Sequence, residues 1–177
     1  MGQTRGVRYL TIVRHCKATP AEAGGPDYDR TLNERGRDQA AQLRQWALDD
    51  GALGRFGPTT ALVSSAARTR ETFHLAFEGT PFVAHCEFSD LIYNGRRDVS
   101  PEDLMIDLAA IDPVTTSLLV VAHNPTVLEL VSELATRLPK ELRRGHYPLG
   151  GAYVFELPDD RQVGLLRYEL VAQYVPL

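Results

Sequence analysis

The chain has 177 residues, of which 44% are hydrophobic and 24% charged, and its 19 Lys and Arg against 23 Asp and Glu give a formal net charge of −4 at pH 7. This composition excludes disorder, collagen and coiled coil as the overall structure and predicts one domain spanning residues 1–177. No basic cluster is larger than a pair of adjacent arginines such as Arg143–Arg144, so the sequence shows no electrostatic footprint for a nucleic-acid backbone.

The first part of the chain predicts a buried strand, a loop and a helix. Val7–Val13 is rich in β-branched and aromatic residues, which is typical of a central strand. The segment Thr19–Arg30 contains Pro and Gly and predicts a loop. Thr31–Glu34 has the Ser/Thr-x-x-Glu form of a capping box, so we expect a helix from there to about Asp49. Its buried face at helical spacing would consist of Ala40, Leu43 and Ala47, with Trp46 beside them.

The middle of the chain repeats the alternation of strand and helix. Thr60–Ser64 predicts a second short strand, and Arg68–Phe77 predicts a helix. Pro81–Ala84 suggests a third strand, whereas Cys86–Val99 is polar, has no period and predicts a loop. A further helix is expected from Ser100, a capping residue followed by Pro and two acids, to about Ile111.

The last part of the chain begins with the strongest strand signal, the continuously apolar run Ser117–Ala122. A helix is expected over Thr126–Leu138, and Ala152–Leu157 with Val163–Val171 predicts a hairpin around Asp159–Asp160. Because strands and helices alternate, we predict an α/β fold, a three-layer sandwich with a mostly parallel central sheet, helices on both faces and a C-terminal β-hairpin.

Targeting signals and cysteines bear on the compartment. The polar segment Met1–Arg8 lacks the apolar stretch of a signal peptide, and no apolar run approaches the roughly 18 residues of a membrane-spanning helix. Cys16 and Cys86 are too few for a disulfide framework. We therefore expect a reduced, cytoplasmic protein with neither a membrane nor nucleic acid as its partner.

Two histidines and two arginines follow the ends of predicted strands. His15 and His123 each come directly after a buried strand, Arg14 precedes the first histidine, and Arg68 follows the second strand. The carboxyl ends of strands in open α/β sheets are where ligands bind, so these four side chains are expected to meet. Guanidinium forks match phosphate oxygens, and a helix start at Asn124 adds backbone donors. The pattern predicts a pocket for a phosphoryl group.

Five segments, in order, resemble motifs of the histidine phosphatase superfamily, and in particular of SixA-type phosphohistidine phosphatases. Arg14–Ala18 resembles the family's Arg-His-Gly signature in its Arg-His-Ala-Lys form, and Leu32–Ala40 resembles the Leu-Thr-x-x-Gly-x-x-Gln-Ala helix start. Val63–Thr72 is similar to the segment that carries the second arginine. Val120–Pro125 resembles the second-histidine motif, and Tyr147–Ala152 resembles the Phe-Pro-Thr-Gly-Ala turn. The resemblance implies a phosphoglycerate mutase-like fold.

The resemblance also implies a mechanism. His15 would attack phosphorus and become transiently phosphorylated, after which water would hydrolyse the phosphoenzyme. Arg14, Arg68 and His123, together with Asn124, would hold the phosphoryl oxygens. Phosphoryl transfer needs mostly positioning and charge stabilisation, and we expect neither a metal nor another cofactor. The expected substrate is a phosphorylated molecule, in the first place a protein that carries phosphohistidine.

The proton donor for the leaving group has two candidates in the segment that follows the second arginine block. Asp90, in Ser89–Leu91, resembles the Pro-Glu-Leu position of the SixA group and is preferred over Glu87. Cys16 replaces the family's usual Gly or Ala, and we expect it to be a small buried side chain rather than a redox-sensitive thiol. Lys17 is left outside the core of the site.

Two other functions fit the same residues. One is a phosphomonoesterase or phosphoglycerate mutase-like enzyme acting on a small molecule, although only 55 positions separate Arg68 from His123, which leaves little room for a cap over the site. The other is a non-catalytic phosphate-binding module, because fold does not fix function. The presence of both histidines and both arginines favours an enzyme.

Overall fold

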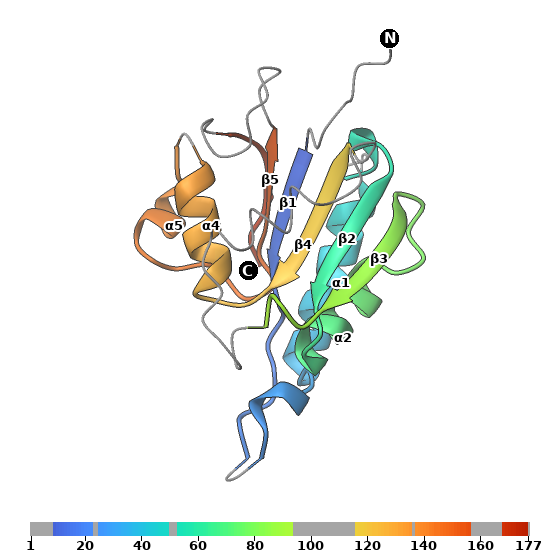
Figure 1. Ribbon diagram of the computed structural model, residues 1–177, viewed down its shortest axis with the longest axis vertical. Coiled ribbons are helices and arrows are strands. Elements are labelled where there is room, and N and C mark those ends of the chain that lie inside the picture. The colour runs from blue at the N-terminus through green and yellow to red at the C-terminus, as the bar shows by residue number, and fades with distance from the viewer. Residues whose placement is uncertain are drawn as a thin grey trace.

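The computed structural model describes residues 9–22, 25–49, 53–93, 116–135, 137–156 and 168–176, and six strands of these residues form one sheet in the order β3-β2-β4-β1-β5-β6 (Figure 1). The strands are β1 Tyr9–Arg14, β2 Thr59–Ser64, β3 Val83–Ser89, β4 Ser117–Ala122, β5 Ala152–Glu156 and β6 Glu169–Tyr174. The α-helices are α1 Glu34–Leu48, α2 Ala67–Ala76, α4 Thr126–Leu134 and α5 Lys140–Arg143, and short 3-10 turns form η1 Asp27–Asp29 and η3 Gly54–Phe56.

The sheet is mostly parallel. β4 pairs in parallel with both β1 and β2, and β3 pairs in parallel with β2. β5 runs antiparallel to β1 and to β6, so the chain ends in the antiparallel pair expected from the sequence. The fold class predicted from the alternation of elements is confirmed. Because β1, β2 and β4 run in one direction, their carboxyl ends lie at one edge of the sheet (Figure 1).

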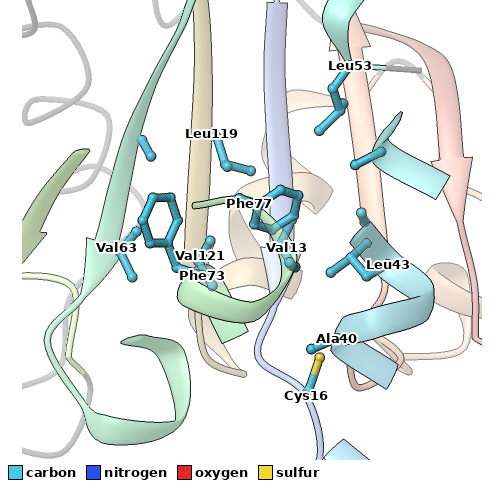
Figure 2. Close-up of a cluster of buried hydrophobic side chains, with 14 of the residues drawn as sticks. Val13, Cys16, Ala40, Leu43, Leu53, Val63, Phe73, Phe77, Leu119 and Val121 are labelled. Carbon is cyan, nitrogen blue, oxygen red and sulfur yellow. The ribbon is translucent and has the colours of Figure 1, made fainter. Parts of the chain in front are cut away.

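Helices cover both faces of the sheet, and the alternation of side chains along each strand separates two apolar cores. On β4, Leu118 and Val120 face the core that contains α4, whereas Leu119 and Val121 face the core that contains α1 and α2. Figure 2 shows this second core, in which the side chain of Cys16 lies beside Ala40 of α1. The expected inner face of α1 is confirmed, since Ala40, Leu43 and Ala47 are fully buried.

The third strand was placed wrongly by the sequence. We expected a strand over Pro81–Ala84 and a loop from Cys86, but β3 extends over Val83–Ser89. The strand lies at the edge of the sheet and most of its side chains are partly or fully exposed, so it has no apolar pattern. Its β conformation comes instead from backbone pairing with β2.

Several boundaries also differ from the expectation. Asn33, and not Thr31, caps α1, because its side chain accepts a hydrogen bond from the Gly36 N–H at 2.9 Å. The helix expected over Thr126–Leu138 ends at Leu134, and the last strand occupies Glu169–Tyr174, whereas its expected start at Val163 lies outside the described residues. The helix expected over Ser100–Ile111 and the turn around Asp159–Asp160 lie outside the described residues. Among the described residues, no helix is both long enough and apolar enough to cross a membrane.

Candidate active site

The structure brings the two sequence-predicted histidines together at the carboxyl edge of the sheet. His15 follows β1 and His123 follows the neighbouring strand β4, and their ring centroids lie 5.2 Å apart. Arg68 lies in the first turn of α2, directly after β2, the strand on the other side of β4. Three adjacent strands thus deliver the residues of the predicted pocket to one place.

His15 is held in one tautomer by the backbone. Its Nδ1 lies 2.7 Å from the carbonyl oxygen of Cys16, and because a carbonyl only accepts, Nδ1 carries the proton and donates it. The lone pair of the neutral ring is therefore on Nε2. Burial and the nearby cations Arg68 and Arg14 lower the pKa of His15 to about 3, so the ring is neutral at physiological pH. A neutral imidazole with a lone pair on Nε2 is the form that attacks phosphorus.

The loop after His15 is fixed at every residue. The His15 N–H donates to Ala122 O, the Cys16 N–H to Thr72 Oγ1, and the Lys17 N–H to Gln39 Oε1, all at 2.9 to 3.1 Å. These bonds tie the loop to β4, α2 and α1 together. Gln39 belongs to the second segment that resembles a family motif, and Thr72 belongs to the third. These hydrogen bonds give both polar side chains a structural role.

Gly36 lets α1 approach this loop closely. A Cβ atom at this position would lie 2.0 Å from the carbonyl oxygen of Lys17, which is a backbone atom and cannot rotate away. The same carbonyl accepts a hydrogen bond from the Asn33 N–H at 3.0 Å. The glycine of the second motif therefore serves the backbone contact between α1 and the His15 loop.

His123 is oriented by Ser64, a residue that the sequence analysis did not single out. Ser64 Oγ lies 2.7 Å from His123 Nε2, while Nδ1 is buried and has no hydrogen-bond partner among the described residues. When the serine hydroxyl donates to Nε2, the proton of the neutral ring lies on Nδ1. Burial, together with His15 and Arg68, lowers the pKa of His123 to about 2. His123 is thus neutral, and the nitrogen that it leaves without a partner is Nδ1, whereas His15 leaves Nε2.

Arg14 is held by the turn that precedes β5. Its Nη1 donates to the carbonyl oxygen of Tyr147 at 2.6 Å, and its Nε is buried without a partner among the described residues. Tyr147 is itself fixed, since its hydroxyl donates to Ile12 O at 2.6 Å. Gly150, at a φ of +72°, closes the turn by donating its N–H to the carbonyl oxygens of Arg14 and His15.

Arg68 contacts a carboxylate from the loop after His15. Its Nη1 donates to Asp27 O at 2.7 Å and its Nη2 to Asp27 Oδ2 at 2.9 Å. Arg30 and the hydroxyl of Tyr93 donate to the same carboxyl group. Desolvation alone would raise the pKa of Asp27, but Arg30, Arg68 and the Tyr93 hydroxyl together lower it. The ring of Tyr93 lies 5.7 Å from the ring of His123. Sequence reasoning missed Asp27, Arg30 and Tyr93, because a loop contact across 41 or 66 positions leaves no periodic signal.

The remaining predicted residues lie at the border of this cluster. Asn124 is partly buried, and its Oδ1 has no partner among the described residues. Asp90 directly follows β3, is exposed and accepts a hydrogen bond from Ser65 Oγ. Glu87 is exposed within β3, where it pairs with Leu62 and not with the end of β2. Lys17 is exposed.

The thiol of Cys16 points into the core. The residue is fully buried beneath the loop, and burial raises its pKa to about 12, so the thiol stays protonated. This agrees with the expectation of a small buried side chain. A reactive thiolate beside the pocket does not follow from this environment.

The site as a whole concentrates donors around one acceptor. Two neutral imidazoles, His15 with Nε2 free and His123 with Nδ1 free among the described residues, lie beside two guanidiniums, an arrangement suited to a tetrahedral oxyanion and an in-line nucleophile. In the described part of the chain there is no group of three or more His, Cys, Asp or Glu placed to hold a metal ion.

Comparison with known proteins identifies relatives of the whole arrangement. Residues 10–95 match the model of the histidine phosphatase superfamily (branch 1). No curated protein matches the sequence at a significant level. The family match contains Arg14, His15 and Arg68, and it supports a phosphatase.

Solved structures show the same fold over almost the full chain. A candidate phosphohistidine phosphatase SixA from Agrobacterium tumefaciens is 27% identical, with a TM-score of 0.74 over 96% of this chain and 99% of that one. A candidate SixA from Nakamurella multipartitia is 26% identical, with a TM-score of 0.73 over 97% and 98%. The protein histidine phosphatase SixA complexed with tungstate, at 20% identity, shares the fold with a TM-score of 0.73 over 94% and 96%.

Proposed function

We propose that the chain is a phosphatase of the histidine phosphatase superfamily, whose model matches residues 10–95, and that it forms a phosphohistidine intermediate and removes phosphate from phosphohistidine in a protein. The observation that carries this proposal is the different nitrogen that each neutral imidazole leaves free. His15 offers a lone pair on Nε2. The buried Nδ1 of His123 has no partner among the described residues, and with the Ser64 hydroxyl donating to Nε2 it offers a proton. One ring is thereby suited to attack phosphorus and the other to hold an oxygen of the same group.

The first step transfers the phosphoryl group to the enzyme. The lone pair on His15 Nε2 forms a bond to phosphorus while the bond from phosphorus to the nitrogen of the substrate imidazole breaks, and the electron pair leaves with that nitrogen. Arg14 Nε and His123 Nδ1, both buried and without partners among the described residues, are suited to the equatorial oxygens. The two guanidiniums stabilise the charge on these oxygens without a metal ion.

The second step returns His15 to its starting state. Water attacks phosphorus, the bond to Nε2 breaks, and the proton of the water leaves with the released phosphate or to solvent. The Nδ1–H bond to Cys16 O persists through both steps, and it stabilises the positive charge that the ring acquires when Nε2 is phosphorylated.

The leaving group determines how much acid catalysis the site needs. A phosphorylated imidazole leaves readily once its ring is protonated, so it does not require a strong protein acid. We propose Asp90 as the proton donor for other leaving groups, because it follows the carboxyl end of β3 whereas Glu87 lies within the strand. Asp27 contacts Arg68 directly but is ionised, since its pKa is lowered by the cations around it.

Single-turnover phosphate release tests the proposal. We would compare a phosphohistidine-bearing protein with p-nitrophenyl phosphate and 3-phosphoglycerate, with a chelator present throughout. The expected result is fast release from the protein and slow release from both esters. A preference for either ester would replace the proposed substrate with a small molecule and would make Asp90 the next residue to change. No release from any substrate, with tungstate still bound, would leave a phosphate-binding module.

A further inference from the structure

The segment 137–146 is strongly basic in an acidic chain. It carries four cations, Arg137, Lys140, Arg143 and Arg144, and one carboxylate, so its net charge is +3 and that of the rest of the chain is −7. All four cations are exposed, and none forms an ion pair with another described residue. We call these four side chains the basic ridge. The proposed chemistry at His15 does not use them.

The ridge stands on a firmly anchored part of the fold. Leu142 of α5 is buried in the core beside α4, and Tyr153 of β5 donates its hydroxyl to Glu141 Oε1 at 3.2 Å. The Arg143 N–H closes the helix on Pro139 O. The cations therefore project from a backbone that does not need to be ordered on binding, which reduces the entropic cost of docking.

A groove runs between the ridge and the edge strand β6. It has a volume of about 550 Å³. One wall holds the cations Arg137, Lys140 and Arg143, and the other consists of Glu169, Leu170 and Gln173 of β6. Leu138 and Pro139 add apolar surface. The lining therefore combines cations, two carboxylates and apolar side chains in one concave surface.

Along the chain, the ridge directly precedes the turn that holds Arg14. The chain passes from Arg144 to Tyr147 in three residues, and the Tyr147 carbonyl accepts the hydrogen bond from Arg14 Nη1 at 2.6 Å. The aromatic ring of Tyr147 also packs against Tyr153, which holds α5. The ridge is therefore joined through one short turn to the residue that holds Arg14 in the candidate active site.

We propose that the basic ridge and its groove dock an acidic face of the protein that carries the phosphohistidine. This inference rests on the proposed function and adds the surface that selects the substrate. A partner with carboxylates around its phosphorylated histidine would be attracted by the ridge, while the −7 charge of the remaining chain would disfavour other orientations.

The composition of the groove favours a protein over other polyanions. Glu141 and Glu169 lie among the cations, and their carboxylates would face the phosphates of a nucleic acid or a lipid surface unfavourably. A folded acidic surface instead offers both signs of charge and apolar atoms, which match the mixed lining. The chain as a whole is negative, so a uniform polyanion would be repelled outside the ridge.

Charge reversal of the ridge separates docking from chemistry. We would compare the double variant Arg143→Glu with Arg144→Glu against the wild type on two substrates, an acidic histidine-containing domain phosphorylated by phosphoramidate and phosphoramidate itself. The matched control is Arg35→Glu with Arg37→Glu, a pair of exposed arginines in the first turns of α1 on the opposite face of the sheet. All three proteins would be assayed at several salt concentrations.

We expect the ridge variant to raise KM for the acidic protein by about tenfold or more, with kcat and phosphoramidate turnover unchanged and with a flatter salt dependence. The control pair should change KM by less than about threefold. Equal losses on both substrates, equal losses in the control pair, or an unchanged KM would overturn the docking proposal. Tight ridge-dependent binding of a single-stranded oligonucleotide or of vesicles of phosphatidylglycerol and phosphatidylcholine would also overturn it.

The failure of the proposed function would look different. In that case the wild type would release no phosphate from any phosphohistidine protein, acidic or basic, and the docking proposal would fall with it. Phosphate release from a phosphorylated histone as fast as from the acidic domain, insensitive to the ridge variant, would overturn the docking surface alone.

Discussion

The loop that carries His15 and the loop that carries Asp27 meet at the same pocket but are built in opposite ways. From His15 to Lys17, each backbone N–H donates to a partner on β4, α2 or α1, and Gly36 seals the contact. Asp27 lies in an exposed 3-10 turn, and its side chain is 47% exposed although it contacts an arginine that is almost fully buried. One loop is part of the core, and the other rests on it.

This difference separates two tasks. The nucleophile must be placed to within a fraction of an ångström before substrate arrives, and backbone hydrogen bonds to three elements achieve that. The guanidinium of Arg68 instead contacts Asp27. The negative charge of this carboxylate lies where a phosphorylated substrate would bring further negative charge. A carboxylate on an exposed turn is able to give way without disturbing the fold. The predictions below test each half of this contrast.

Removal of the nucleophile should have the largest effect. We expect His15→Ala to lower kcat by about three orders of magnitude or more, because the covalent step has no substitute. Phosphate release in a single turnover measures it. Binding of tungstate and the thermal midpoint should change little, which shows that the pocket is still folded, and His146→Ala at an exposed position serves as the control. Near-normal activity in a folded His15→Ala protein would remove this residue from the mechanism.

The rigid half of the contrast depends on Gly36. We expect Gly36→Ala to destabilise the protein by about 1–3 kcal/mol, since its Cβ would overlap the Lys17 carbonyl, and this exceeds the gain in helix propensity. Urea unfolding measures the loss, and kcat should fall with it as the His15 loop shifts. Gly54→Ala is the matched control, because a Cβ there meets nothing within 4 Å. Equal stability of the two variants would contradict a tight contact at α1.

The buried imidazoles should make stability depend on pH. In the folded protein the pKa values of His15 and His123 are lowered to about 3 and about 2, whereas in the unfolded chain they are near 6.5. The unfolded state therefore binds more protons below pH 6.5, and stability is complete above that pH and falls as the pH drops toward 3.

At pH 5.5 the loss should be about 1 kcal/mol for each histidine. Urea midpoints at pH 7.5, 6.5 and 5.5 measure this loss, and carboxylates contribute little in that range. A double His15→Gln, His123→Gln variant should show a flatter profile than the wild type. Identical profiles for the two proteins would mean that the pKa values of the two rings are not lowered in the folded state.

The sequence predicts the central elements well because burial imposes a pattern on them. Ser117–Ala122 forms β4 with the predicted bounds, and the strand-to-helix transition before Arg68 is confirmed. An edge strand has no such requirement, so most of β3 reads as a polar loop. The same logic holds at the site. His15 and His123 are predictable from their places at strand ends.

The contacts that tune these residues are set by tertiary structure. Ser64 reaches His123 only because β2 and β4 are neighbours in the sheet, and Asp27 reaches Arg68 only because its loop folds back over the pocket. Neither relation leaves a spacing in the sequence. Only after the chain is folded does a polar residue in an irregular segment acquire a role.

The exposed half of the contrast is tested by Asp27→Asn, for which we expect the smallest effect. Asp27 engages two of the five N–H groups of Arg68, and its charge opposes an incoming dianion. The amide keeps the shape and removes that charge, so affinity for tungstate should rise by about two- to tenfold, most clearly at low salt. Isothermal titration measures it, and Asp29→Asn in the same exposed turn is the control.

The direction of this change decides what Asp27 does. If tungstate binds more tightly to Asp27→Asn and the control is unchanged, the carboxylate competes with substrate for the arginine. If tungstate binds more weakly, the carboxylate holds the guanidinium in the orientation that the phosphoryl group needs, and the exposed loop is then as much a part of the preformed site as the loop of His15. The sign of one affinity change therefore distinguishes a rigid pocket with one mobile wall from a pocket that is rigid throughout.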